Sequence, residues 1–463
     1  MYKPDYIYTF SDIRDKLDFV HINNLRDGQE YTLRVAIDDV QLASFCNDRL
    51  YGNVADLGDI AAAVYTADRL SVRSKQVPRH IHINLPVRFP AMLNSKQVKE
   101  ALEELLYWFT HDHWTFSFTE RRSQSRQPLE WQLSLPHTDE HFVHKRVSLW
   151  SGGVDSLAGL CNFLHAEPDL KHILFGTGAN TYIHKLQRDL KTAVAKQFPE
   201  SKIELIQVPI YLRETTSHRG RNRDMRARGF IFMILGAVCA YLQGQNTLHI
   251  YENGLGAINL AYRLSEVGLD HARSVHPISL KRMGELVSLI LGETFRFDNP
   301  FLFWTKAEMC KVFLHSNAAA LINRSTTCDR RHRGKIKQCG WCSSCILRRQ
   351  ALAAVGIRDN TRYVVTHVRQ AQEQETSHLQ AMLHQVDVLE MQLNQSDPWY
   401  HLSQRFVDLN DVVNQTAESH GLGKDEMIVR LLRLYNQYVY EWRQVRDQIH
   451  LGGSPKQNVQ LAA

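Results

Sequence analysis

Between residues 145 and 358, segments typical of β-strands alternate with segments typical of helices, and no other feature of this 463-residue sequence constrains the fold as strongly. Repeated strand and helix units of this kind indicate a parallel sheet with helices on both faces. One of the helical segments, 230–242, is apolar on all sides, as expected of a buried helix. The sequence therefore predicts an α/β domain in 145–358.

Two regions with different patterns flank this domain. Residues 1–144 combine helical spacing with short segments that alternate apolar and polar residues, which predicts an α+β domain whose role the pattern does not indicate. We predict strands there at 31–37, 80–87, 114–119 and 131–135, and helices at 59–69 and 98–109. Residues 359–463 carry no strand pattern and predict a helical C-terminal region, with helices at 371–394, 399–416 and 425–449.

The composition excludes several classes of protein. Hydrophobic residues make up 44% of the chain and charged residues 22%, which excludes wholesale disorder. The longest apolar run, 230–242, is shorter than the roughly 20 residues that span a bilayer, and the first residues lack the apolar stretch of a signal peptide. A disulfide framework is not expected for eight cysteines in so long a chain. We therefore predict a cytoplasmic protein without a membrane partner.

A glycine-rich loop follows the first predicted strand of the α/β domain and opens a helix. Two adjacent glycines permit a tight turn and a close approach to a ligand, and the free N–H groups of a helix start attract anions. An ordinary capped turn is the alternative, but the whole loop at this place favours phosphate binding, with Asp155 holding a Mg²⁺ ion that bridges the phosphates. The predicted phosphate loop consists of Ser151, Gly152, Gly153, Val154, Asp155 and Ser156.

Four cysteines near the end of the predicted α/β domain have the spacing C-x10-C-x2-C-x2-C. Four thiolates so arranged can surround Zn²⁺ as a tetrahedron, and the residues between the first two are too polar for a protein core. A redox or iron–sulfur role is the alternative, because two of the cysteines also resemble a dithiol pair. We favour structural zinc, held by Cys328, Cys339, Cys342 and Cys345, and expect Cys46, Cys161, Cys239 and Cys310 to be core residues.

The positive charge is concentrated in two segments. The whole chain has 55 Lys+Arg and 49 Asp+Glu, a net charge of +6, whereas 211–228 alone carries +4 and 328–349 carries +6. A solvated face is the plain interpretation of either segment. Alternatively, the first folds over ATP, and the second contacts the same polyphosphate or an acidic segment of a partner. Nucleic acid is not favoured as a partner, because neither segment interleaves stacking aromatic residues with its charges.

The phosphate loop resembles the pyrophosphate-binding (PP) loop of the N-type ATP pyrophosphatases. Together with the cysteine motif, which continues as CGWCSSC-x-LRR, it resembles the 7-cyano-7-deazaguanine synthase (QueC) family over residues 145–358. Two intermediate segments support this resemblance, Arg228 at the start of the apolar helix and the stretch from Asn299 to Glu308. The resemblance implies an enzyme that uses ATP, Mg²⁺ and Zn²⁺. It makes Asp155, Arg228 and Lys306 the candidate catalytic residues, although Lys306 also suits an ordinary surface position.

The chain departs from the family pattern near the expected deazapurine pocket. Where the family has an acidic residue and then a Tyr-Pro-Asp-Cys-Arg motif, this chain has residues 254–263, with Asn259 at the acidic position. The layout, with a long α+β front and a helical tail, is more similar to the QueC-like proteins of bacterial anti-phage operons (Qat systems and type IV CBASS). That resemblance implies attachment of a deazaguanine to the amino terminus of a partner protein.

These observations predict an adenylating C–N ligase. It activates a 7-carboxy-7-deazaguanine-type carboxylate with ATP, releases pyrophosphate and passes the acyl group to an amine. Backbone N–H groups and arginines such as Arg228 stabilise the leaving pyrophosphate. Three alternatives remain: a synthase that makes the free nitrile base, a tRNA-modifying PP-loop enzyme that uses Cys339 and Cys342, and a non-catalytic ATP-bound scaffold.

Overall fold

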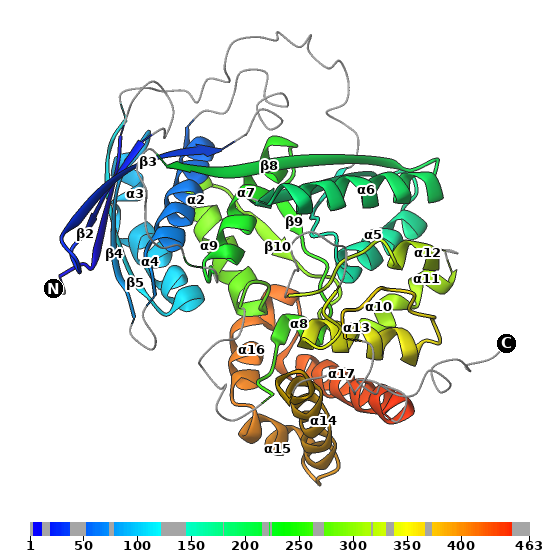
Figure 1. Ribbon diagram of the computed structural model, residues 1–463. Coiled ribbons are helices and arrows are strands. Elements are labelled where there is room, and N and C mark those ends of the chain that lie inside the picture. The colour runs from blue at the N-terminus through cyan, green and yellow to red at the C-terminus, as the bar shows by residue number, and fades with distance from the viewer. Residues whose placement is uncertain are drawn as a thin grey trace.

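A ten-stranded sheet runs through the first two thirds of the chain (Figure 1). The computed structural model describes residues 3–11, 19–37, 52–73, 78–121, 145–178, 180–214, 222, 225–262, 273–315, 318–329, 338–365 and 373–446. Its strands are β1 (Tyr6–Phe10), β2 (Phe19–Asn24), β3 (Gln29–Ile37), β4 (His80–Val87), β5 (His113–Glu120), β6 (Lys145–Leu149), β7 (Lys171–Gly178), β8 (Lys202–Glu214), β9 (Thr247–His249) and β10 (Arg296–Asp298). Their order in the sheet is β10-β9-β6-β7-β8-β3-β2-β1-β4-β5.

The helices cover both faces of the sheet and form a separate group after the last strand. Those that precede the last predicted region are α2 (Asn53–Leu70), α3 (Pro90–Leu93), α4 (Lys96–Thr110), α5 (Val154–Ala166), α6 (Thr181–Gln197), α7 (Arg228–Leu242), α8 (Gly254–Ile258), α9 (Pro277–Leu291), α10 (Lys306–Cys310), α11 (Val312–His315), α12 (Ala319–Ile322) and α13 (Ser343–Ala354). The others are α14 (Glu373–Leu393), α15 (Pro398–Arg405), α16 (Asp408–Thr416), the 3₁₀ helix η4 (Glu418–His420) and α17 (Lys424–Val445).

The strands β6 to β10 form the predicted parallel sheet, which confirms the α/β fold class. Two hydrophobic clusters occupy its two faces: Val147, Ile173 and Phe175 pack with α7 and α9, whereas Leu174 packs with α5 and α6. The chain runs outward from β6 through β7 to β8 and then returns to the other side of β6 with β9. This reversal creates a switch point between β6 and β9, and open α/β sheets bind ligands at the carboxyl ends of such strands.

The N-terminal region continues the same sheet. β3 pairs antiparallel with β8, from Leu33 opposite Glu214 to Ile37 opposite Ile210, so the first two predicted regions share one sheet. The predicted strands at 31–37, 80–87 and 114–119 are confirmed as β3, β4 and β5, and both predicted helices are confirmed as α2 and α4. The segment 131–135 lies outside the described residues. β1 and β2 had not been predicted.

Helix α2 is buried along nearly its whole length and carries its acidic residues into the interior. Asp68 and Asp112 both accept hydrogen bonds from Arg79, at 2.6 Å each, and all three side chains are fully buried. Buried charges persist only when they are paired, so this arrangement requires α2, β4 and the start of β5 to be correctly assembled. Asp68 also accepts the backbone N–H of Ala227 at 2.9 Å, which joins α2 to the start of α7.

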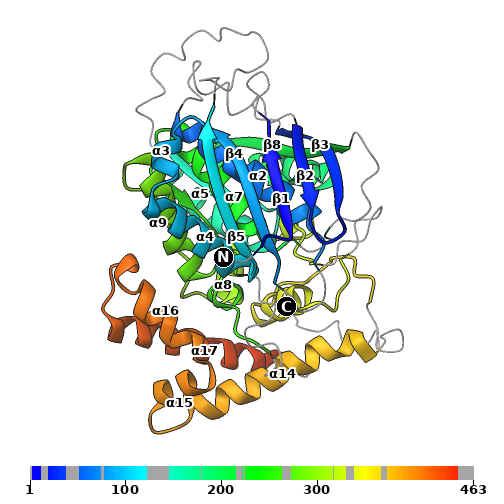
Figure 2. The same cartoon turned by 90° about the vertical axis from the view of Figure 1, so that its left-hand side faces the viewer.

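The C-terminal helices lie together at one end of the molecule, away from the N-terminal strands (Figures 1 and 2). Two of the predicted helices are confirmed as α14 and α17. The single helix predicted over 399–416 is wrong: the chain leaves the helical conformation at Phe406, so that α15 and α16 are separate. Within the described residues, no helix is long and apolar enough to cross a membrane.

The buried Arg79 pairs predict a large stability effect. We expect Arg79→Ala to lower the free energy of unfolding by about 3–5 kcal/mol, because the fully buried Asp68 loses its guanidinium partner while Asp112 keeps its ion pair with Arg73. The partly exposed pair of Arg26 with Asp5, at 2.8 Å, provides the control, and Arg26→Ala is expected to cost less than about 1 kcal/mol. Urea unfolding followed by circular dichroism measures both. Equal losses in the two variants would contradict the prediction.

Candidate functional site

The predicted phosphate loop lies at the switch point, between the end of β6 and the start of α5. Gly152 has φ +77°, a conformation that L side chains rarely adopt, and this turns the chain back toward the helix. The Ser151 hydroxyl accepts the N–H of Gly153 at 3.1 Å and lies 3.1 Å from the Ser156 hydroxyl. Val154 is the first residue of α5 and is fully buried. The helix therefore presents its free amides to the loop, as anion binding requires.

Neighbouring segments hold the loop in place. The backbone N–H of Thr326 donates to the Gly152 carbonyl at 2.9 Å. On the other side, the Gln187 amide donates to the Trp150 carbonyl at 2.5 Å, and the Trp150 indole donates to the Gln187 carbonyl at 3.1 Å. The loop conformation thus depends on α6 and on the segment before the cysteines, which are both remote in sequence.

Asp155 is the centre of a buried polar cluster. Its side chain forms an ion pair with the ammonium group of Lys306, and both residues are less than 10% exposed. The amide of Asn253 donates to the other oxygen of Asp155 at 3.0 Å and to Glu252 at 2.7 Å. Residues from the start of α5, the segment after β9 and the start of α10 therefore meet at one point.

Glu252 belongs to this cluster as a second carboxyl group. Burial, followed by the charge of Asp155, raises its pKa to about 8, although Lys306 acts in the opposite direction. For Lys306, burial lowers the pKa, but the charges of Asp155 and Glu252 prevail and raise it overall. The site therefore holds a charged lysine beside one carboxylate, and Glu252 remains largely protonated up to neutral pH.

Arg228 lies at the start of α7, beside the carboxyl end of β7. Its guanidinium group lies over the ring of Phe232, 5.0 Å from the centroid, and a side chain at Gly178 would come within 3.6 Å of the same ring. Surrounding protein atoms exclude water from the guanidinium group and so lower the pKa of Arg228, whereas the negative charge of Asp329 acts in the opposite direction. The charge of Asp329 also raises the pKa of Glu252, so this carboxylate acts electrostatically on both Arg228 and the polar cluster.

Sequence reasoning missed Glu252 and Asn253 and emphasised Asn259 instead. Asn259 has φ 50° and ψ 57° and ends α8 in the left-handed conformation, a place where asparagine is favoured for backbone reasons. The available signal was the position of Glu252 and Asn253 directly after an apolar strand. Polar residues at that point lie at the carboxyl edge of a parallel sheet, next to the phosphate loop. Lys306, for which a surface position was the alternative, is buried.

The four predicted metal ligands come together. The sulfur atoms of Cys328, Cys339, Cys342 and Cys345 all lie within 4.8 Å of one another, and every one of these residues is buried. A tetrahedral Zn²⁺ site with bonds of about 2.3 Å needs sulfur atoms about 3.8 Å apart, so the cluster fits zinc. Backbone N–H groups of Cys339 and Cys342 point at sulfur atoms, at 3.3 and 3.2 Å. Such donors stabilise thiolates. Cys161, Cys239 and Cys310 are buried elsewhere, and Cys46 lies outside the described residues.

Arg348 connects the cysteine cluster to the phosphate loop. This residue belongs to one of the two basic segments, but it is fully buried and therefore does not contribute to a solvated or polyphosphate-binding face. Its guanidinium group donates to Ser325 and to the Ile322 carbonyl, each at 2.8 Å. The segment that it holds includes Thr326, the partner of Gly152. Most of the other basic residues of 328–349 lie outside the described residues.

A doubly wound parallel sheet, a glycine-rich loop at its switch point and a nearby cysteine cluster together define an α/β domain of the PP-loop type. Comparisons with known proteins agree with this class. The sequence model of the family "Queuosine biosynthesis protein QueC" matches residues 275–356, which include Lys306 and all four cysteines of the cluster.

Curated relatives are 7-cyano-7-deazaguanine synthases. The chain is 26% identical to 7-cyano-7-deazaguanine synthase 2 of Desulfitobacterium hafniense over 233 residues, which is 48% of this chain and 94% of the relative. It is 24% identical to the synthase of Prochlorococcus marinus over 229 residues, 46% of this chain and 96% of the relative. A shorter match to the synthase of Acetivibrio thermocellus has 34% identity over 73 residues, 16% of this chain and 31% of the relative. More than half of this chain therefore has no counterpart in the first two relatives.

The geometry of the cysteine cluster predicts bound zinc. We expect about one zinc atom per chain by elemental analysis, and expect Cys342→Ser to lose the metal and melt at a lower temperature. Cys161→Ser, which changes a buried cysteine of α5 outside the cluster, should keep its zinc and so separates metal loss from loss of stability. Iron with visible absorbance in the purified protein would contradict the assignment.

The environment of Glu252 predicts a pH-dependent stability. Its pKa is about 8 in the folded protein and near 4.5 when unfolded, so the folded state binds the proton more tightly. The free energy of unfolding of the wild type should therefore fall, relative to Glu252→Gln, as the pH rises from about 5 through about 8. Urea unfolding at several pH values measures the difference. A difference that stays constant with pH would show that Glu252 titrates normally.

Proposed function

We propose that this protein is an ATP-dependent adenylating enzyme that activates a 7-carboxy-7-deazaguanine-type carboxylate and joins it to an amine of a partner protein. One observation carries the proposal: the phosphate loop lies at the switch point beside the buried pair of Asp155 and Lys306. The similarity to 7-cyano-7-deazaguanine synthases supplies the substrate class.

In the first step of the proposed reaction, a substrate carboxylate oxygen forms a bond to the α-phosphorus of ATP. The bond from that phosphorus to the β-phosphate oxygen breaks, and pyrophosphate leaves. The amides of residues 151–156 and the guanidinium group of Arg228 stabilise the charge that develops on the phosphates. This step needs little proton transfer, so the protein acts mainly by positioning and by charge.

Lys306 and Asp155 have different electrostatic roles. Lys306 brings a positive charge to the base of the loop, and Asp155 keeps it in place. Mg²⁺ also fits at Asp155, because each carboxylate oxygen has a lone pair beyond those used by Lys306 and Asn253, and hard oxygen ligands suit this ion. When bound, the ion would neutralise phosphate charge. Glu252 and Asp329 are the other carboxyl groups beside it.

In the second step, an amine attacks the acyl carbon, the bond to AMP breaks and an amide forms. We favour a protein amine over ammonia because the chain lacks the Tyr-Pro-Asp-Cys-Arg motif after β9 and has α8 there instead. The match to the first relative also covers only 48% of this chain, which has a ten-stranded sheet and a helical C-terminal region. These features resemble the QueC-like proteins of anti-phage operons, so a role in antiviral defence forms part of the proposal.

A nitrile synthase is the second candidate function, and the names of the relatives favour it. In that reaction, ammonia gives an amide, and a second adenylation removes the amide oxygen to leave the nitrile. A tRNA-modifying enzyme that used Cys339 and Cys342 as reactive thiols is less compatible with the site, because both are buried among the four sulfur atoms. A scaffold without catalysis would not release pyrophosphate with any substrate.

One mass measurement separates these functions. The protein is incubated with 7-carboxy-7-deazaguanine, ATP, Mg²⁺ and the products of the neighbouring genes, and all components are analysed by mass spectrometry. We expect one protein to gain the deazaguanine acyl group as AMP and pyrophosphate are released. Free nitrile base without a protein adduct would support the synthase instead, and absence of pyrophosphate release would support the scaffold.

Two variants test whether pyrophosphate release depends on the residues of the candidate site. We expect Asp155→Ala and Lys306→Ala to lower the rate of pyrophosphate release by at least about 10²-fold, because they remove charge next to the reacting phosphates. The exposed pair of Lys185 with Asp189 on α6 provides matched controls, and Lys185→Ala and Asp189→Ala should retain the wild-type rate. Similar losses in both pairs would contradict the assigned site.

A further inference from the structure

Helix α17 contacts the short helix that carries Lys306. The Thr305 hydroxyl, at the start of α10, donates to the carboxylate of Glu441 at 2.6 Å, and both residues are buried. Gln437, one turn earlier on α17, donates to the same Glu441 oxygen at 2.9 Å. Burial raises the pKa of Glu441, whereas the bonds from Thr305 and Gln437 lower it. The last helix of the described residues thus contacts the residue immediately before Lys306.

A second contact joins the same two helices. Glu308 completes a capping box with Thr305, in which each side chain binds the backbone of the other residue, at 3.1 and 2.8 Å. Arg433 of α17 forms an ion pair with Glu308 and donates to the Phe303 carbonyl at 2.9 Å. Both residues of the box that starts α10 are therefore bound by side chains of α17.

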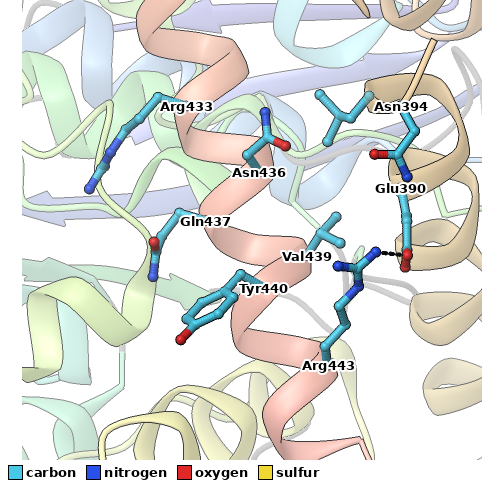
Figure 3. A pocket seen from close by; sticks show the side chains of 9 residues that line it. Glu390, Asn394, Arg433, Asn436, Gln437, Val439, Tyr440 and Arg443 are labelled. Atoms are coloured by element: carbon cyan, nitrogen blue, oxygen red, sulfur yellow. Dashed lines mark ion pairs between the residues drawn. The ribbon is translucent and has the colours of Figure 1, made fainter.

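Helix α10 depends on such external contacts. It has only five residues, Lys306–Cys310, and isolated helices shorter than about 12 residues are unstable in water. Figure 3 shows that Arg433 and Gln437 extend to one side of α17, whereas Arg443 extends to the other side, toward Glu390 of α14. One face of α17 thus binds the start of α10, and another binds the neighbouring helix.

We infer that Arg433 and Glu441 of α17 are positioning residues that hold the Lys306 ammonium group at Asp155. This inference gives the helical C-terminal region a part in the reaction. The inference rests on the proposed function. The path is short: Glu441 binds Thr305, Arg433 binds Glu308, and these two residues cap the helix whose first residue is Lys306. Misplacing a catalytic group by about 1 Å can cost about 10²-fold in rate.

The test measures ATP–pyrophosphate exchange with 7-carboxy-7-deazaguanine in variants of the full chain. We expect Arg433→Ala and Glu441→Ala to lower kcat by about 10- to 100-fold with little change in KM for ATP, because the loop itself is intact. Glu441→Gln keeps an acceptor oxygen for Thr305 and should restore most of the rate. Arg443→Ala breaks an ion pair of the same helix with α14 and should retain the wild-type kcat.

A second readout does not require activity. Lys306 is 4% exposed, so acetic anhydride should label it slowly in the wild type. Arg433→Ala and Glu441→Ala should label faster at Lys306 by peptide mass spectrometry, and Arg443→Ala should not. Unchanged labelling, or an equal effect of Arg443→Ala, would overturn the inference. If the wild type shows no exchange at all, the proposed function fails, and the labelling alone decides the positioning role.

Discussion

The buried ion pair between Lys306 and Asp155 is the interaction on which the rest of the structure depends. Its partners are 151 residues apart in sequence, and neither charge is tolerated in the interior without the other. To form the pair, the chain must bring the loop after β6 against the start of α10, with Asn253 from the end of β9 bridging to Asp155. The same packing of the loop against α10 places the glycine-rich loop at the switch point of the sheet.

Each of the three regions of the chain contacts a different part of the site around Asp155. The cysteine segment holds the loop through Arg348 and Thr326, and α17 holds the helix of Lys306 through Arg433 and Glu441. The N-terminal region acts on the third side, because Asp68 of α2 binds the backbone at the start of α7, next to Arg228. The N-terminal region and the C-terminal helices are thus both connected to this site.

Some of this arrangement could be predicted from local pattern. The glycine-rich loop was predicted from a short stretch after an apolar strand, and the cysteine cluster from the spacing of four cysteines, because both depend on neighbouring residues. Lys306, by contrast, lies in no pattern that separates a buried lysine from an exposed one. Glu252 and Asn253 were missed for the same reason: their importance comes from the position of β9 beside β6.

The sequence by itself determined the α/β class, the glycine-rich loop and the cysteine cluster, since periodicity, turns and cysteine spacing are properties of adjacent residues. Only the tertiary structure decided which charges are buried together. Arg348, which the sequence grouped with a basic surface, is an internal hydrogen-bond donor, and Asn259, which stood at an expected acidic position, ends a helix. Burial and pairing arise when distant segments meet, so the raised pKa of Glu252 and the contacts of α17 with the start of α10 follow from packing and not from any local motif.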